Sequence, residues 1–244
     1  MNDLPRVFIG SSPFIGAGQF GFRALEYYRK FYLQPRNIVK VVSAAYKLGV
    51  KGFQLLPFKP LVEATKKLKL RNECPEHVVG TVGCNDYKSE IGVLKGLEAK
   101  ACLVHASITD SLKATRILEV YDAVREEGMS YGLVTHRPGR LLEWLMKSKL
   151  ECPILLLPLN KIGYMADMPF RRIAELISMF KGVVLAKKVL AAGRLKPKEA
   201  LNFISHVDKV YGVVIGASSE SEVKETFRIA LSIYEGHSVE SAPA

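Results

Sequence analysis

The sequence predicts a single (β/α)8 barrel. Eight short apolar runs alternate with eight amphipathic stretches along the 244 residues, and nearly every run ends in a small, polar or basic residue. The length is close to the ~250 residues typical of one such barrel. Eightfold strand–helix alternation is the sequence pattern of this fold, in which functional side chains lie at the C-terminal ends of the strands. The runs are Val7–Phe14, Gly52–Pro57, His77–Gly83, Ala101–Ser107, Ser130–His136, Pro153–Asn160, Gly182–Lys188 and Gly212–Ser218.

The stretches between the runs predict the helices. Apolar residues recur at spacings of three and four, as in Ile117, Val120 and Val124, which is typical of a helix with one buried face. Glycine follows several of these stretches, as expected at a helix C-terminus. The expected helices are Arg23–Tyr32, Arg36–Leu48, one from near Pro60, Tyr87–Ala99, one capped by Thr109 or Asp110, Leu141–Lys149, Pro169–Phe180, Pro197–Lys209, and a last one capped by Ser218 or Ser219.

The chain is expected to be one domain. Residues 1–236 form the barrel, and residues 237–244 are a short polar tail that we expect to be disordered. No apolar run approaches the ~18 residues that a membrane span needs, so no membrane partner is expected. The first residues carry Asp3 and lead directly into a strand, which is unlike a signal peptide. We therefore expect a cytoplasmic protein.

The net charge of +11 and the pI near 9.4 have two interpretations. The ordinary one is a solvated surface rich in lysine. The sharper one is an anionic small-molecule ligand, because basic residues such as Lys187 and Arg194 follow a strand end. Nucleic acid is not expected, since the basic residues are spread over the helices and form no nucleic-acid-binding motif. The sequence gives no prediction of oligomeric state.

The four cysteines form no C-x-x-C pair, so we expect free thiols rather than a zinc ribbon or a redox motif. Cys84, His105 and His136 end three successive strands, which raises a metal site. No clear carboxylate accompanies them, and structural zinc usually has four ligands. No metal is therefore predicted.

Alternation along the strands selects the candidate site residues, because every second side chain of a barrel strand points inward. His105 is either a satisfied core histidine or a residue that donates to, or accepts from, a substrate oxygen. The candidates at the strand ends are Ser12, Gln54, Val82, Cys84, His105, Thr135, His136, Asn160, Lys187, Lys188, Ser218 and Ser219.

Lys187 and Lys188 end the seventh run, and alternation directs one of them inward. A buried, neutral lysine amine attacks carbonyl carbons and forms Schiff bases. The alternative is a lysine whose amine reaches solvent at the barrel mouth. Alternation alone leaves open which of the two lysines points inward.

The segment Gly216-Ala217-Ser218-Ser219 joins the eighth run to the last helix. Free backbone N–H groups at a helix N-terminus bind anions, and barrels often hold phosphate after strands seven and eight. Ordinary serine capping explains the same residues. We expect a bound phosphate here, with the capping interpretation left open.

Several of these segments resemble the aldo-keto reductase superfamily. Val183–Leu195 resembles its strand-seven segment, and Val214–Val223 resembles its dinucleotide-phosphate segment. Leu103–Ser107 resembles the strand that carries the catalytic histidine, which is His105 here, and Gly132–His136 resembles the strand that ends in Ser-Asn. The resemblance implies a barrel, NAD(P) as cofactor, bound by Gly216, Ala217, Ser218 and Ser219 together with Thr135 and His136, and hydride transfer as the activity.

The sequence departs from that superfamily at most of its catalytic tetrad. Gln54 stands at the aspartate position, Val82 at the strand-three lysine position, and Thr135-His136 where the Ser-Asn pair occurs. Lys187 stands where an aromatic residue usually stacks on the nicotinamide, so the resemblance implies that Lys187 points into the barrel mouth and that Lys188 points away. The standard reductase reaction is therefore expected to be slow or absent.

Three functional interpretations follow from the sequence. The first is a diverged reductase-like barrel that binds a nucleotide or another phosphate-bearing small molecule, with His105 and Gln54 at the reacting centre and NAD(P) as a possible cofactor. The second is a lyase or aldolase-type enzyme that uses Lys187 as a Schiff-base nucleophile. The third is a ligand-binding barrel without catalysis.

Overall fold

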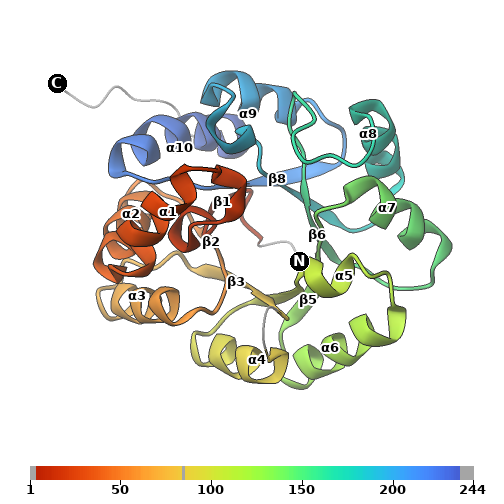
Figure 1. The fold of residues 1–244 in the computed structure, drawn as a ribbon, viewed down its shortest axis with the longest axis horizontal. Coiled ribbons are helices and arrows are strands. Elements are labelled where there is room, and N and C mark those ends of the chain that lie inside the picture. The colour runs from red at the N-terminus through yellow and green to blue at the C-terminus, as the bar shows by residue number, and fades with distance from the viewer. Residues whose placement is uncertain (1–3, 84–85, 237–244) are drawn as a thin grey trace.

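The computed structural model, which describes residues 4–83 and 86–236, contains a closed barrel of eight parallel strands in the order β1 to β8 (Figure 1). Each strand pairs with its sequence neighbour, and β8 closes the barrel on β1. This confirms the predicted (β/α)8 barrel. The strands are β1 Val7–Gly10, β2 Gly52–Leu55, β3 His77–Val82, β4 Ala101–Val104, β5 Ser130–Val134, β6 Ile154–Pro158, β7 Val183–Lys187 and β8 Val210–Ile215.

Helices surround the barrel on its outside (Figure 1). Two short 3-10 helices and a π-helical turn lie between β1 and α2, and a third 3-10 helix follows β7. The elements are η1 Pro13–Ile15, η2 Gly18–Phe20, α1 Arg23–Tyr27, η3 Tyr28–Tyr32, α2 Pro35–Lys47, α3 Lys59–Leu70, α4 Tyr87–Gly96, α5 Ala106–Thr109, α6 Ala114–Glu126, α7 Pro138–Lys147, α8 Phe170–Met179, η4 Ala191–Gly193, α9 Pro197–Ser205 and α10 Glu220–Glu235.

The structure differs from the sequence prediction most clearly after β4. A helix capped by Thr109 or Asp110 was expected there, but the short α5 begins right after His105 and the long α6 begins only at Ala114. Leu112 lies between them with φ of 57°, a left-handed conformation that interrupts a helix. Asp110 is therefore the C-terminal cap of α5 and stays beside the barrel mouth.

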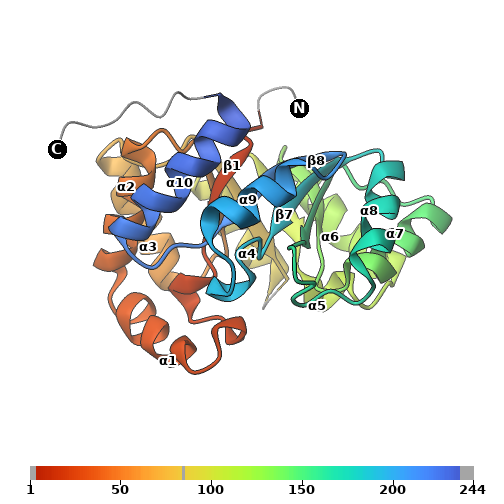
Figure 2. The same ribbon diagram turned by 90° about the horizontal axis from the view of Figure 1, so that it is seen from above.

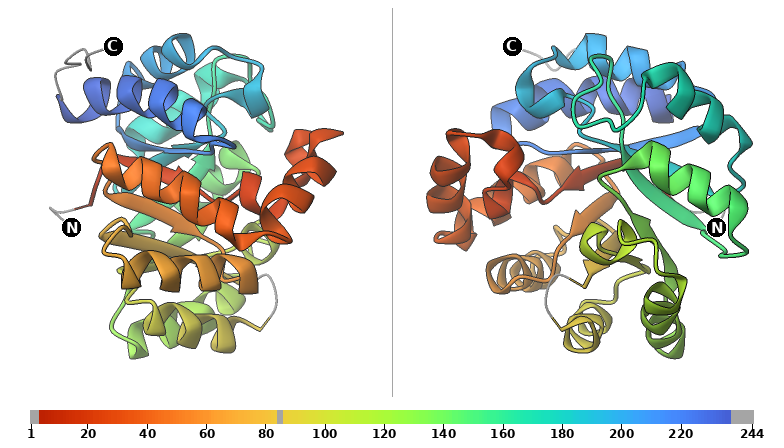
Figure 3. Two further views of the ribbon diagram at one scale, coloured as in Figure 1. Left: turned by 90° about the vertical axis from the view of Figure 1, so that its left-hand side faces the viewer. Right: turned by 45° about the vertical axis from the view of Figure 1, so that its right-hand side comes forward.

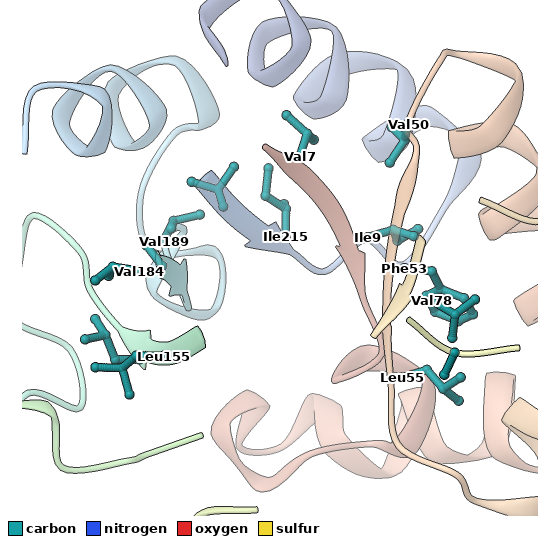
Figure 4. Packing of buried hydrophobic residues seen from close by; sticks show 14 of the residues in the cluster. Val7, Ile9, Val50, Phe53, Leu55, Val78, Leu155, Val184, Val189 and Ile215 are labelled. Atoms are coloured by element: carbon teal, nitrogen blue, oxygen red, sulfur yellow. The ribbon is translucent and has the colours of Figure 1, made fainter. Parts of the chain in front are cut away.

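Two hydrophobic layers alternate along each strand. The larger cluster joins alternate strand residues to the helices, and Figure 4 shows some of its members on β1, β2, β3, β6, β7 and β8. A second cluster of Phe8, Leu103, Val134, Leu185 and others fills the barrel interior. Burial of each large side chain contributes roughly 1.5–3 kcal/mol. The interior is therefore a packed core, and open space for a ligand remains only toward the strand ends.

The helices α1 and α5 mark the end of the molecule at which the strands finish (Figure 2). The segment that contains α1 stands off from the ring of helices at this end (Figure 3). Among the residues described, no helix combines the length and the apolar character needed to cross a bilayer. Cys74, Cys102 and Cys152 are free thiols, whereas Cys84 and the tail at 237–244 fall outside the described residues.

We expect Gly132→Ala to destabilise the protein by roughly 1–3 kcal/mol, the usual cost of overpacking a barrel interior. A Cβ atom at Gly132 would lie 2.1 Å from the carbonyl oxygen of Ile154 on the neighbouring strand, and a backbone oxygen cannot move without disturbing the β5–β6 pairing. The measurement is the free energy of unfolding in denaturant.

Gly92→Ala is the matched control, because nothing lies within 4 Å of a Cβ atom at this position inside α4. Alanine in a helix interior is favoured over glycine by roughly 0.5–1 kcal/mol, so this variant should be as stable as the parent or more stable. Equal stability of the two variants would contradict the tight β5–β6 contact.

Candidate active site

Polar side chains replace the apolar interior layer at the strand ends. Leu103, Val134 and Leu185 belong to the interior cluster. Two residues further along the same strands come His105, His136 and Lys187, so alternation directs all three toward the barrel mouth. The predicted inward position of Lys187 agrees with this register.

The strand-three position requires a correction. Val82 was expected at the mouth, but it packs in the outer cluster between strand and helices. Thr81 is the inward residue, because it alternates with the interior Val79. Its hydroxyl accepts a hydrogen bond from Nε2 of Gln54 over 3.1 Å. The Gln54–Thr81 pair is therefore an uncharged contact at the barrel mouth.

A cavity of about 300 Å³ opens at this mouth. It extends from the ends of β1 and β2 across β7 and β8 to the first turns of α10. This volume is at the lower end of the range for small-molecule sites. The residues that line it include Ser12, Arg23, Gln54, Lys187, Lys188, Gly216, Ser218 and Glu222.

The Lys187 amine is the most perturbed titratable group of the site. Burial lowers the pKa of Lys187 well below its ordinary value, and the positive charge of Lys188 lowers it further, while the carboxylate of Asp110 opposes both. Desolvation disfavours the charged ammonium form. The neutral, nucleophilic form of this amine is therefore more populated than that of an exposed lysine at the same pH.

Lys188 does not point toward the helices, as strict alternation would require. It has φ of 59°, which breaks the alternation directly after β7 ends at Lys187. Its Nζ lies 2.9 Å from Sδ of Met165, and the residue lines the same cavity as Lys187. Burial lowers the pKa of Lys188 to about 8, again against the pull of Asp110.

The ring of His105 has a defined orientation. It caps α5, and its Nδ1 accepts a hydrogen bond from the backbone N–H of Ser107 over 3.1 Å. A nitrogen that accepts carries no proton, so the neutral ring carries its proton on Nε2. Burial, followed by the charge of Lys187, lowers the pKa of His105, whereas Asp110 raises it. His105 is thus a neutral hydrogen-bond donor near pH 7.

Asp110 ties His136 and Thr135 to this centre. One carboxylate oxygen accepts from Oγ1 of Thr135 over 2.5 Å, and the other accepts from the backbone N–H of His136 over 3.1 Å. The rings of His105 and His136 lie edge to face, with centroids 6.1 Å apart. Burial and the charges of Lys187 and Lys188 lower the pKa of His136. Both histidines therefore offer neutral rings near pH 7.

The predicted anion site at Ser218 and Ser219 contains a carboxylate of the protein itself. Ser219 caps α10, with its hydroxyl accepting from the N–H of Glu222. The Glu222 carboxylate in turn accepts from the backbone N–H of Ser218 over 2.7 Å and from its hydroxyl over 2.8 Å. A phosphate at this helix N-terminus would have to displace that carboxylate.

The other predicted positions have structural partners. Gly216 lines the cavity, where a Cβ atom would lie 2.8 Å from the ring of Pro13, whereas Ala217 packs in the outer core. The Asn160 side chain donates to the carbonyl of Tyr164 and accepts from its N–H, which holds the loop after β6.

Sequence reasoning missed Asp110 and Glu222 as residues of the mouth. Asp110 was interpreted only as a helix cap, and no carboxylate was expected at these strand ends. Its place in the fold follows from the unexpected break at Leu112. Glu222 could have been found from the spacing Ser219-x-x-Glu222, which is the capping-box pattern of a helix N-terminus.

Comparison with known proteins supports the barrel class. No family model matches the sequence, and no curated protein matches it. A solved structure titled "putative aldo-keto reductase" from Pseudomonas aeruginosa superposes with a TM-score of 0.68 at 19% identity, covering 93% of this chain and 90% of that one. A D-tagatose 3-epimerase-like protein superposes with a TM-score of 0.55 at 11% identity, covering 95% of this chain and 98% of that one. A chain of the tryptophan synthase α2β2 complex from Pyrococcus furiosus superposes with a TM-score of 0.52 at 12% identity, with 94% of each chain covered. At these identities the similarity establishes the (β/α)8 barrel fold and nothing finer.

Replacement of the enclosed amine should stabilise the protein. We expect Lys187→Met to raise the melting temperature at pH 7, because the parent must bury a group that prefers to be charged. The folded-state pKa lies below the unfolded one, so the parent gains stability as the pH rises from the folded-state pKa toward ~10.4, the value for an unfolded lysine. The advantage of the variant should accordingly be largest at low pH and shrink toward pH 10.

Lys181→Met serves as the control, since Lys181 is exposed. Thermal unfolding followed by circular dichroism between pH 5 and 10 provides the comparison. A Lys187→Met protein that is less stable than the parent at every pH would show that the amine makes stabilising contacts.

Proposed function

We propose that the protein is a Schiff-base enzyme of the lyase or aldolase type, in which Lys187 attacks a small carbonyl substrate at the barrel mouth. The observation that carries the proposal is the enclosed Lys187 amine, whose pKa is lowered by burial and by Lys188. It faces a cavity of small-molecule size, beside two histidines with lowered pKa values. Surface lysines lack this combination.

The first step joins the amine to the substrate. The lone pair of the neutral Lys187 nitrogen attacks the carbonyl carbon, and the π electrons of the carbonyl move to its oxygen. A proton passes from nitrogen to that oxygen, and a further proton lets the oxygen leave as water. The neutral ring of His105 is suited to donate a hydrogen bond from Nε2 to that oxygen, while the proton itself comes from solvent. The product is an iminium ion on Lys187.

The iminium ion then accepts electrons from an adjacent bond. In the direction of cleavage, a base removes the proton of a hydroxyl group on the β-carbon, the bond between the α- and β-carbons breaks, and its electron pair forms an enamine. The neutral ring of His136 is suited to accept a hydrogen bond from that hydroxyl, and the proton passes on to solvent because a pKa lowered to about 3 makes the ring a weak base. Protonation of the enamine and addition of water release the second carbonyl product and regenerate Lys187. No group beyond water is consumed.

Asp110 supports this centre electrostatically. It holds Thr135 and the backbone of His136, and its charge opposes the effect of burial on Lys187 and Lys188. The iminium nitrogen formed on Lys187 carries a positive charge as long as the Schiff base is protonated. A carboxylate beside it stabilises the intermediate relative to the neutral amine.

NAD(P)-linked oxidoreduction, the first interpretation of the sequence, remains a prediction. The residues at the barrel mouth fit this cofactor poorly. The Glu222 carboxylate engages the N–H and hydroxyl of Ser218, where the cofactor's phosphate would bind. Gln54 and Thr81 offer no carboxylate or amine to assist a proton donor. We therefore derive no hydride-transfer step, and ordinary aldehydes should turn over slowly with NADPH, if at all.

Borohydride trapping tests the Schiff base. The protein is incubated near pH 7.5 with pyruvate or with dihydroxyacetone phosphate, reduced with sodium cyanoborohydride, digested and mapped by mass spectrometry. We expect the adduct on Lys187, with a labelling rate that rises with pH as the amine loses its proton and levels off below pH 10. Lys187→Arg should abolish the adduct while it keeps a basic group.

Lys188→Arg is the matched control, because it preserves the neighbouring positive charge. It should leave the Lys187 adduct in place. Labelling confined to exposed lysines such as Lys181, with Lys187 unmodified in every condition, would overturn the proposal and favour a ligand-binding barrel without catalysis.

A titration with NADPH tests the predicted anion site at Ser218 and Ser219. We expect the parent protein to bind NADPH weakly and Glu222→Gln to bind it at least about fivefold more tightly, because the change removes a like charge worth ~1 kcal/mol beside the phosphate. Ser218→Asp, which adds a charge, should weaken binding in the Glu222→Gln background. Nicotinamide fluorescence provides the measurement, and tight binding by the parent would refute this account of Glu222.

A further inference from the structure

A second cavity of about 680 Å³ lies outside the barrel, between α2, α10 and the C-terminal end of α3. It shares no lining residue with the cavity at the mouth. Seven of its lining residues are basic and two, Glu73 and Glu220, are acidic. We call this cavity the basic groove; its basic residues are Arg36, Lys40, Lys47, Lys67, Arg71, Lys224 and Arg228.

The periodicity of the helices brings these cations onto facing surfaces. On α2 they occur at Arg36, Lys40 and Lys47, which share one face of a helix. Arg36 and Lys47 are eleven residues apart, or roughly 16 Å of helix. Lys224 and Arg228 are one turn apart on α10, and Lys67 and Arg71 are one turn apart at the end of α3. Basic side chains from α2, α10 and the end of α3 therefore all line the groove.

The other helix junctions show how this protein usually places its surface cations. Lys69 pairs with Glu98, Lys95 with Glu127, Lys161 with Glu199, and Arg172 with Glu143, in each case across two neighbouring segments. In the basic groove, Lys47 pairs with Glu73 at 2.7 Å, and Glu73 also accepts from Ser43. Within the described residues, the other six cations have no carboxylate within ion-pair distance. Among the described residues that line the groove, the two carboxylates therefore offset only part of the positive charge.

We propose that the basic groove binds a compact polyphosphate, an anion with three or more phosphate groups. The volume lies within the range of small-molecule sites. Lysine and arginine side chains on three helices would contact several phosphate groups simultaneously. The lining contains no aromatic residue and no amide side chain, so nothing in it would stack on or read a nucleic-acid base. These features favour a small polyphosphate over a nucleic-acid strand.

Isothermal titration of the full-length protein tests the proposal with three probes: sodium tripolyphosphate, orthophosphate and a 12-nucleotide single-stranded DNA. We expect tripolyphosphate to bind at least tenfold more tightly than orthophosphate and more tightly than the oligonucleotide. The double variant Lys40→Gln/Arg228→Gln should weaken tripolyphosphate binding at least tenfold, because it removes charges from two sides of the groove.

The matched control is Lys181→Gln/Lys198→Gln, which removes the same net charge from exposed positions outside the groove. It should leave the affinity within about twofold. Equal losses in both double variants would reduce the effect to net charge and overturn the proposal. So would tripolyphosphate that binds no more tightly than orthophosphate, or groove-dependent binding in which the oligonucleotide is preferred.

A melting-temperature measurement covers the case in which the groove variant folds poorly. Saturating tripolyphosphate should raise the melting temperature of the parent, since a ligand that binds only the folded state stabilises it. The single variant Lys224→Gln should reduce that increase, and Lys181→Gln should not. An identical increase in parent and Lys224→Gln would overturn the groove assignment.

Discussion

Closure of eight parallel strands is the constraint on which the rest of this molecule depends. Once the strands pair in a ring, each side chain faces either the interior or the helices, and a shift of one residue would exchange the two sets. The two hydrophobic clusters alternate along the strands accordingly. The same register carries His105, His136 and Lys187 to one end of the interior. The site is therefore a continuation of the core, with polar side chains in its last layer.

A lysine in that layer lowers the stability of the fold, because its ammonium form is desolvated, and the neighbouring groups offset this desolvation only in part. Burial and Lys188 both disfavour the Lys187 ammonium ion, and Asp110 opposes them without forming an ion pair with it. A structural role would be served better by an apolar side chain or by a direct carboxylate partner. Titratable groups held in an unfavourable state are characteristic of functional sites, since their reactivity depends on that state. This argument favours chemistry at Lys187 over a purely structural lysine.

Most of the fold could be predicted from the sequence, whereas only part of the site could. The apolar runs locate all eight strands because burial on both faces of a parallel strand leaves a continuous apolar signal. The inward position of Lys187 was predicted from the resemblance to the aldo-keto reductases, because alternation alone leaves two adjacent lysines to choose from. The position of Lys188 does not follow from alternation, because a positive φ after the strand end has no composition signal in a lysine. Val82 was placed inward by a register error of one residue, and Thr81 takes that position.

Asp110 and Glu222 illustrate why local patterns leave a site incomplete. Asp110 reaches Thr135 on the next strand only because the chain turns at Leu112 before α6 begins. Glu222 follows a capping pattern, but its carboxylate bonds to Ser218 rather than to the N-cap residue that the capping-box pattern implies. Each carboxylate accepts hydrogen bonds from residues that follow a strand end, Thr135 and His136 for Asp110 and Ser218 for Glu222, so its partner depends on the tertiary fold.

The distribution of charge connects these observations. Net positive charge far from zero destabilises a compact state through repulsion. This chain limits that cost with ion pairs across several helix junctions, yet it concentrates cations at the barrel mouth and in the basic groove. At the mouth, enclosure lowers the pKa of both lysines, so they lose their protons more readily than exposed lysines and their repulsion decreases as they do. In the groove the side chains are exposed, so relief of their repulsion requires an external anion. The same net charge therefore points to two different chemistries, a neutral nucleophile inside the barrel and an electrostatic site outside it.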